Sequence, residues 1–168
     1  MTNKKAKFKN IYEQSKDKIY RLCLGFTGNK MDADDLFQEV YIKVWNNLES
    51  FRAESNINTW IFRIATNTAI VFVSKRTKLN KKINQTEIEN VSFINENSEN
   101  IYSDKKIVKL YQTISNLKEK DRIIISLLLE KNSYSEIAEI IGMNISNVGV
   151  RINRIKKNLT KKMNSYGK

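Results

Sequence analysis

The residues best suited to binding chemistry lie on one side of a helix expected near the C-terminus. Ser146, Asn147, Arg151, Arg154 and Lys157 fall opposite an apolar stripe with helical spacing. Hydroxyl and amide side chains form hydrogen bonds with base edges, whereas Arg and Lys neutralise phosphates. From residue 142 to residue 168 there are seven basic residues and no acidic one. The sequence therefore predicts that this side of the helix reads DNA in the major groove.

A helix-turn-helix is the element that would position these side chains. Ser133 and Glu136 have the spacing of a capping box, which begins a first short helix. Gly142 suits the left-handed backbone at which a helix ends, and Asn144 suits the N-cap of a second helix. The second helix would bury a stripe of apolar residues: Ile145, Val148, Ile152, Ile155 and Leu159. Taken alone, this stretch also fits an ordinary amphipathic hairpin with a solvated basic face.

Composition limits the classes of function. The chain has 168 residues and a formal net charge of +12, which indicates a polyanionic partner, either nucleic acid or an anionic membrane. It has no His and a single cysteine, Cys23, so neither an internal disulfide nor a Cys/His zinc site is possible. We expect Cys23 in the core and no metal or cofactor. Without His or a Gly-rich phosphate loop, an enzyme is the least favoured class.

The sequence gives no sign of a membrane segment. The apolar run at residues 61–73 is too short to span a bilayer and contains Arg63 and Asn67. The N-terminus lacks the apolar core of a signal peptide. We therefore expect no membrane insertion and a cytoplasmic protein.

The N-terminal half predicts three helices. A basic and mobile tail at residues 2–7 precedes a first amphipathic helix that runs from Phe8 to Phe26, and Asp32 opens a second. On the outer side of the second helix lies a set of residues that we call the acidic ridge: Asp35, Gln38, Glu39 and Ile42. In a basic chain, such a ridge fits either a basic protein partner or an ordinary solvated face.

A polar loop at residues 51–58 leads into the third helix. Arg63 and Asn67 lie on its outer side, and the helix continues into Lys75 and Arg76. Cations beside amide groups suit a nucleic-acid backbone with exposed bases. Trp45 and Trp60 have the spacing of core residues rather than stacking platforms.

The composition changes sharply between residues 83 and 104. This segment has five acidic residues, five Asn and no Lys or Arg, which is typical of a flexible linker. The sequence therefore predicts an all-α chain with two small helical domains, residues 1–82 and residues 105–168, joined by the linker 83–104.

Two stretches resemble the extracytoplasmic-function (ECF) sigma factors of the sigma-70 family. DADDLFQEVYIKVWNNLESFRAESNINTWIFRIATN resembles their region 2, and LKEKDRIIISLLLEKNSYSEIAEIIGMNISNVGVRINRIKKNL resembles their region 4. The resemblance implies a minimal sigma subunit of bacterial RNA polymerase, without regions 1.1 and 3. It also implies three partners: core polymerase, promoter DNA and an anti-sigma factor. The contacts with core polymerase would be made to its beta-prime clamp and its beta flap.

The resemblance assigns roles to particular residues. The acidic ridge would dock on the coiled coil of the beta-prime clamp. The minus-ten element would be captured as single-stranded bases by Phe51, Arg52, Ser55, Asn56, Asn58, Arg63, Asn67, Lys75 and Arg76. The minus-thirty-five element would be read as duplex by Ser146, Asn147, Gly149, Val150, Arg151, Arg154 and Lys157.

The chain departs from the family pattern in its DNA-binding helices, and Leu117 lacks the Pro that often follows it. Val71 stands where an Asp often follows the Asn of the third helix, and Gly149 and Val150 stand where the recognition helix usually has a cation followed by Ser. A helix-turn-helix regulator without a sigma role is the main alternative function. A response regulator would need alternating strands and helices in its first domain, and we expect no strands. An anti-sigma or RNA-binding helical protein would explain the charge, but not the acidic ridge together with two separate basic surfaces.

Overall fold

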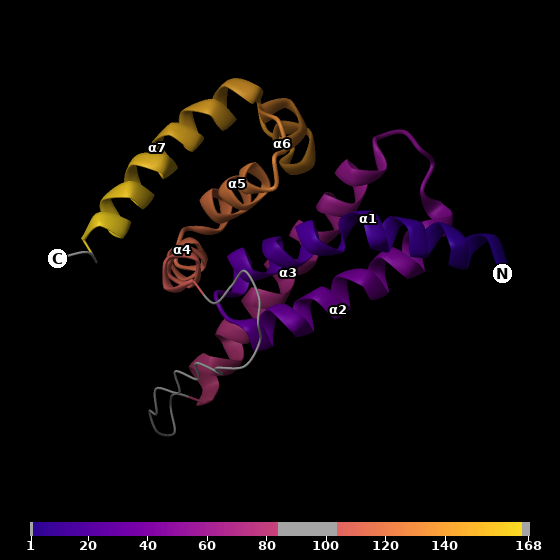
Figure 1. Ribbon diagram of the computed structural model, residues 1–168, viewed down its shortest axis with the longest axis horizontal. Coiled ribbons are helices and arrows are strands. Elements are labelled where there is room, and N and C mark those ends of the chain that lie inside the picture. Colours follow the sequence, from indigo (N-terminus) through magenta and orange to yellow (C-terminus); the bar gives the residue numbers. More distant parts are fainter. Residues whose placement is uncertain (1, 84–103, 166–168) are drawn as a thin grey trace.

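The N-terminal half of the protein is built from three long helices. The computed structural model describes residues 2–83 and 104–165 (Figure 1). Helices α1 (Thr2–Thr27), α2 (Lys30–Asn47) and α3 (Ile57–Ile83) pack against one another, and the short 3-10 helix η1 (Leu48–Ser50) follows α2. Asn29 caps α2 by accepting a hydrogen bond from the Asp32 N–H at 2.9 Å, so α2 begins two residues before Asp32.

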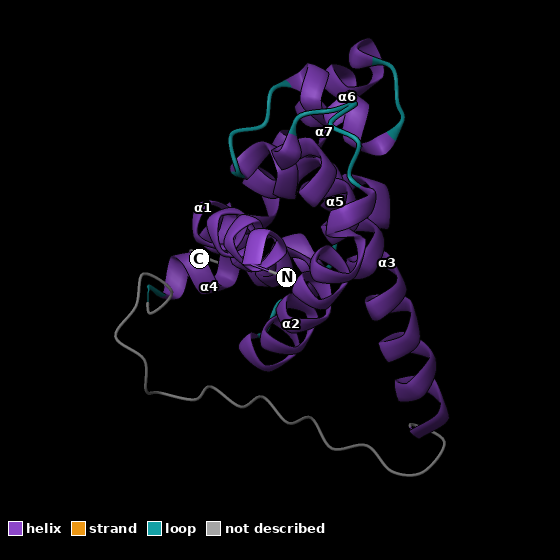
Figure 2. Cartoon of the chain, turned by 90° about the vertical axis from the view of Figure 1, so that its right-hand side faces the viewer, coloured by secondary structure: helices purple, strands orange, loops and turns teal. Residues whose placement is uncertain are grey.

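The C-terminal half contains the predicted helix-turn-helix. Its helices are α4 (Lys105–Ser115), α5 (Glu119–Leu129), α6 (Tyr134–Ile141) and α7 (Ile145–Asn164). The capping box of Ser133 and Glu136 is present, and these hydrogen bonds hold the pKa of Glu136 below its usual value. Gly142 has the expected left-handed backbone (φ +66°), and Asn144 caps α7. Within the described ranges the chain forms helices and loops but no strand (Figure 2), which confirms the all-α prediction.

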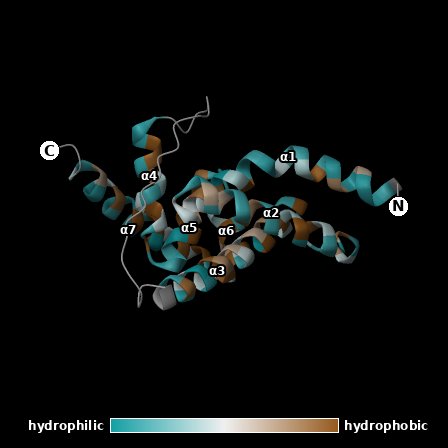
Figure 3. Ribbon diagram, turned by 90° about the horizontal axis from the view of Figure 1, so that it is seen from below, coloured by the Kyte–Doolittle hydropathy of each residue, from teal (hydrophilic) through white to brown (hydrophobic). Residues whose placement is uncertain are grey.

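The helices are amphipathic, as their sequence patterns predict (Figure 3). The side chains of Leu22, Leu36, Val44 and Ala65 from α1, α2 and α3 are fully buried. Cys23 is also fully buried, and burial raises the pKa of its thiol, so it is a core residue as expected. Trp60 is only partly buried at the edge of this core, and Trp45 is partly buried against the Phe8 ring.

The prediction of a mobile N-terminal tail at residues 2–7 is wrong. This segment forms the first turns of α1, which begins at Thr2. Lys4 lies 3.4 Å from the Glu49 carboxylate and 4.8 Å from the ring centroid of Trp45, and Lys7 lies over the Phe51 ring at 5.5 Å. These contacts with α2, η1 and the following loop hold the N-terminal turns in place.

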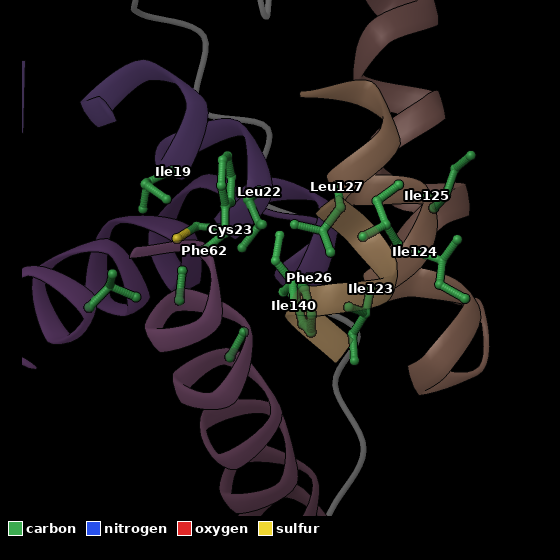
Figure 4. Close-up of a cluster of buried hydrophobic side chains, with 14 of the residues drawn as sticks. Ile19, Leu22, Cys23, Phe26, Phe62, Ile123, Ile124, Ile125, Leu127 and Ile140 are labelled. Atoms are coloured by element: carbon green, nitrogen blue, oxygen red, sulfur yellow. The ribbon is translucent and has the colours of Figure 1, made fainter. Parts of the chain in front are cut away.

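One hydrophobic core crosses between the two halves. Figure 4 shows Leu22 and Phe26 from α1 facing Ile123 and Leu127 from α5. Helices α4 and α5 pack on α1, and α6 packs on α3. The predicted linker 83–104 lies outside the described residues, apart from its two ends.

Polar contacts reinforce the seam between α1 and α5. The Arg21 guanidinium donates two hydrogen bonds to the Glu130 carboxylate, at 2.9 and 2.7 Å, and only 3% of the Glu130 side chain is exposed. Arg122 donates from Nη1 to the Phe26 carbonyl at 3.1 Å. At Gly25, an added Cβ would lie 2.7 Å from Ser126 Oγ, so the helices approach closely here because Gly25 has no side chain. These hydrogen bonds and the close approach at Gly25 therefore determine how α1 and α5 pack against each other.

Candidate nucleic-acid interface

Helix α7 exposes one polar stripe and buries the opposite side. Val148, Ile152, Ile155 and Leu159 are buried against the helices beneath. Ile145 is an exception to the sequence prediction, because 52% of this residue is exposed at the first position of the helix. We call the exposed side of α7 the reading stripe, and it consists of Ser146, Asn147, Val150, Asn153, Arg154 and Lys157. Asn153 was not among the sites predicted from the sequence, although its spacing from Asn147 and Val150 could have revealed it.

Two arginines of α7 are held by an acid on α5. Asp121 accepts a hydrogen bond from Arg151 Nη1 at 2.7 Å, and Arg154 Nη2 lies 3.4 Å from both oxygens of the same carboxylate. The Arg151 side chain is 32% exposed and the Arg154 side chain 64% exposed. Arg151 therefore fixes α7 on α5, while Arg154 remains open to solvent. Local spacing cannot reveal this contact, because Asp121 lies 30 residues from Arg151.

Gly149 lies beside the reading stripe. A Cβ added to Gly149 would meet the Tyr134 ring at 3.6 Å, an ordinary van der Waals distance. Gly149 therefore lies on the side of α7 that faces α6, while its neighbour Val150 is 68% exposed.

The outer side of α3 carries the predicted single-strand contacts. Arg63 and Asn67 are exposed one helical turn apart, and Lys75 is exposed further along. Arg63 Nη2 donates to the Glu139 carbonyl of α6 at 2.8 Å. Arg76 forms an ion pair with Asp32 and lies over the Phe72 ring. Arg63 and Arg76, two of the cations predicted to bind DNA, therefore form contacts within the chain.

The loop before α3 presents polar groups beside an aromatic pair. The ring centroids of Phe51 and Trp60 are 5.0 Å apart. Arg52 and Asn58 are exposed, and Ser55 is partly buried. The remaining predicted loop residue, Asn56, has a structural role as well, because its side-chain oxygen accepts a hydrogen bond from the Asn58 N–H at 2.9 Å. That bond helps to begin α3.

The acidic ridge lies on the solvent side of α2. Asp35 and Gln38 are exposed, Ile42 is 59% exposed, and Glu39 lies 3.3 Å from the Lys43 ammonium. An open groove of about 410 Å³ adjoins the ridge between α1 and α2. Its lining combines two ridge residues with aromatic rings: Phe8, Tyr12, Phe37, Gln38, Tyr41, Ile42 and Trp45. The surface therefore offers carboxylates next to an exposed apolar patch.

Other classes of site find little support in the described part of the chain. Residues 2–83 and 104–165 contain no cluster of three or more acidic, Cys or His side chains that could hold a metal. Among the helices described, none combines the length and apolar character needed to cross a membrane. What the geometry presents is an acidic ridge on one half, a basic helix-turn-helix on the other, and between them the outer side of α3 with Arg63 and Asn67. This is the arrangement of a helical DNA-binding protein that also has a protein partner.

Comparisons with known proteins identify the family. Residues 11–79 match the Sigma-70 region 2 family, and residues 107–159 match the Sigma-70, region 4 family. The ECF RNA polymerase sigma factor SigW of Bacillus subtilis is 32% identical over 167 residues, covering 93% of this chain and 88% of the relative. The ECF RNA polymerase sigma-E factor of Escherichia coli K12 is 33% identical over 141 residues, covering 79% of this chain and 74% of the relative.

Solved structures show the same fold. The sigma factor RpoE, in complex with the anti-sigma factor NepR from Bartonella quintana, has a TM-score of 0.74 at 22% identity and covers 92% of this chain and 95% of that one. CnrH, in complex with the cytosolic domain of CnrY, has a TM-score of 0.65 at 18% identity. The chain belongs to the ECF RNA polymerase sigma factors of the sigma-70 family. It binds core RNA polymerase, directs it to promoters and initiates transcription there.

Proposed function

We propose that each half of this sigma factor makes a different set of contacts at the promoter. The acidic ridge binds the beta-prime clamp of core polymerase, the loop at residues 51–58 and the outer side of α3 hold the minus-ten element as single strand, and α7 reads the minus-thirty-five element as duplex. The observation that best supports this division is the contrast in charge. Asp35 and Glu39 lie on the solvent side of α2, whereas α7 has no acidic residue.

The proposal requires the two halves to separate on the promoter. By their names, the two elements are centred about 25 base pairs apart, which is about 85 Å of duplex at about 3.4 Å per base pair. In the structure Arg63 of α3 lies 2.8 Å from a carbonyl of α6, and α7 follows α6 after a short turn. The two proposed DNA surfaces are therefore adjacent in this closed arrangement. We propose that residues 1–82 and 105–168 act as domains and that the linker 83–104 lets them move apart.

Further partners and the site of action follow from the family. An anti-sigma factor is a proposed partner, because the similar Bartonella sigma factor was solved with one bound. The beta flap of core polymerase is a proposed partner of the C-terminal domain. The chain would act in the cytoplasm, where its polymerase works, and would need no cofactor or catalytic group, since its role consists of binding.

Removing an amide from α3 is expected to impair promoter opening. Asn67 is exposed beside Arg63, so Asn67→Ala removes a hydrogen-bonding group from the proposed single-strand surface. One such bond contributes about 1 kcal/mol, so the fraction of open promoter should fall about fivefold. Permanganate reactivity of unpaired thymines in the reconstituted holoenzyme complex measures this fraction. Asn10→Ala, which changes an exposed Asn on α1, is the matched control. Equal opening by both variants would remove Asn67 from the single-strand site.

Two residues of the reading stripe are expected to differ in the kind of contact they make. Asn147 lies in the first turn of α7, where side chains of this motif reach base edges, whereas Lys157 lies where the phosphate backbone passes. Asn147→Ala should relax discrimination at one position of the upstream element by about 1–3 kcal/mol. Lys157→Ala should weaken all sequences alike and lower the slope of log affinity against log salt by about one.

A promoter-library selection with the holoenzyme measures the change in discrimination, and binding titrations of the selected promoter at several salt concentrations measure the slope. If Asn147→Ala leaves the preference at every upstream position unchanged, α7 does not lie in the groove as proposed. If Lys157→Ala changes the preference at one position only, its contact is with a base rather than with a phosphate.

A further inference from the structure

The contacts that join the two halves also occupy part of the proposed DNA surface. Helix α6 packs on α3, and the Glu139 carbonyl of α6 accepts a hydrogen bond from Arg63 Nη2 at 2.8 Å. Arg63 is one of the cations proposed to hold the minus-ten strand. The closed arrangement therefore uses a DNA-binding group for an intramolecular contact, and it also keeps the two DNA surfaces too close together to reach both promoter elements.

The seam between α1 and α5 holds this closed arrangement. Its centre is apolar, with Leu22 and Phe26 of α1 facing Leu127 of α5 (Figure 4). The bidentate ion pair of Arg21 and Glu130 joins α1 to the C-terminal end of α5. The seam thus combines apolar burial with a directional polar contact, and both are lost when the halves separate.

The seam also contains a defect that favours its opening. Arg122 Nε and Ser126 Oγ are buried on α5, and neither atom forms a hydrogen bond within residues 2–83 and 104–165. A buried polar group without a partner lowers stability, and both groups would be hydrated if the halves separated. Permanent cores satisfy almost all of their buried polar groups. The unsatisfied atoms therefore fit a contact that is made and broken.

These observations point to a regulatory role for the seam. We propose that it is an autoinhibitory clasp, which holds the free chain in the closed arrangement and opens when the chain engages polymerase and promoter. Because only the open fraction can bind both promoter elements, the apparent affinity of the chain is reduced by that fraction. The inference rests on the proposed function, which assigns one promoter element to each half.

A disulfide across the seam tests whether the closed arrangement is inactive. A Cβ added to Gly25 would lie 3.6 Å from the Ser126 Cβ, within the range of about 3.5–4.5 Å that a disulfide requires. The Gly25→Cys, Ser126→Cys variant is made with Cys23→Ala, which removes the one natural cysteine. Oxidised glutathione forms the bridge and dithiothreitol breaks it, so the reduced protein is the matched control. With core polymerase, the oxidised chain should initiate at promoters at least about tenfold less than the reduced chain, because almost no open form remains.

Gly25→Leu is expected to have the opposite effect and open the clasp. The added Cβ would already lie 2.7 Å from Ser126 Oγ and 3.6 Å from Ile114 Cγ2, so a larger side chain has no room in the closed arrangement. Leu is a better helix former than Gly, so the substitution does not weaken α1 itself. At a fixed concentration of core polymerase, the chain concentration that gives half-maximal initiation should fall about threefold or more, because the open fraction rises.

Fluorescence energy transfer in the free chain measures the opening itself. Dyes are attached through Asp17→Cys on α1 and Ser135→Cys on α6, two exposed positions on different halves, again with Cys23→Ala. Energy transfer should be lower in the Gly25→Leu chain than in the otherwise wild-type chain.

Two further variants are the controls for the opening. The Gly25→Ala, Ser126→Ala variant removes the hydroxyl that would clash, and the remaining neighbours of the new Cβ lie at 3.6 Å, an ordinary van der Waals distance. It should remain closed, with energy transfer at least as high as in wild type and no gain in initiation. Asn10→Leu places the same large side chain at an exposed position of α1 and should behave as wild type.

The outcomes distinguish the clasp from the proposed function. If the oxidised and reduced chains initiate equally well, the halves need not separate, and the proposed division of the promoter fails together with the clasp. If oxidation blocks initiation but Gly25→Leu leaves energy transfer unchanged, the clasp alone is overturned. A fall in energy transfer without any gain in initiation would also overturn it, because the closed arrangement would then exist without inhibiting the chain.

Discussion

Replacing both Asp35 and Glu39 with lysine is expected to abolish the binding of core RNA polymerase. The two carboxylates lie one helical turn apart on the solvent side of α2, beside the groove that Ile42 and Trp45 line. If the beta-prime clamp presents basic groups here, the double variant brings like charges together in an interface that excludes water. Such contacts cost several kcal/mol, which lowers affinity by a factor of a thousand or more when both positions contribute.

Gel filtration of the double variant with core polymerase measures the loss. The matched control is the Glu13→Lys, Asp17→Lys variant, which places the same charge change at the same spacing on α1. Glu13 also has a lysine neighbour, Lys16 at 2.6 Å, as Glu39 has Lys43. The control should bind core polymerase nearly as wild type does. Normal binding by the Asp35→Lys, Glu39→Lys variant would show that the acidic ridge is only a solvated face.

The second large effect is expected at the seam between the two halves. Arg21→Met leaves the Glu130 carboxylate, which is 3% exposed, without its bidentate partner. Breaking a buried ion pair in this way costs about 3–5 kcal/mol. Because 36% of the Arg21 side chain is exposed, water can partly solvate the carboxylate, and we expect a loss of about 2–3 kcal/mol in the free energy of unfolding.

Urea denaturation at neutral pH measures this loss. Lys16→Met provides the control, because it breaks an exposed pair with Glu13 on the same helix and should leave the free energy of unfolding nearly unchanged. A second variant, Arg21→Met with Glu130→Leu, removes both charges and should recover much of the stability. If Arg21→Met lowers the free energy of unfolding as little as Lys16→Met does, the two halves do not pack through this seam in solution.

Local signals in the sequence predicted the helix-turn-helix well. The capping box, the left-handed glycine and the alternating spacing of Val148, Ile152 and Ile155 are properties of neighbouring residues, and the structure contains all of them. The acidic ridge also follows from helical spacing alone, and its residues are exposed or partly exposed. Local periodicity therefore reveals which side of a helix is apolar.

Contacts between distant residues were not visible in the sequence. Arg21 and Glu130 are 109 residues apart, and Arg63 reaches an α6 carbonyl 76 residues away. The sequence predicts DNA contacts for Arg63 and Arg151, and nothing in their local spacing indicates a partner within the chain. The helical start of α1 was missed for the same reason, because it is stabilised by contacts of Lys4 and Lys7 with Trp45, Glu49 and Phe51.

Reconstituted transcription tests the central claim most directly. The purified chain is mixed with core polymerase lacking any sigma subunit and with fragmented genomic DNA, and the 5′ ends of the transcripts are mapped. We predict that the chain elutes with core polymerase and that initiation occurs at defined sites that share an upstream and a downstream element. A chain that binds duplex DNA but neither elutes with core polymerase nor starts transcription at such sites would contradict the account.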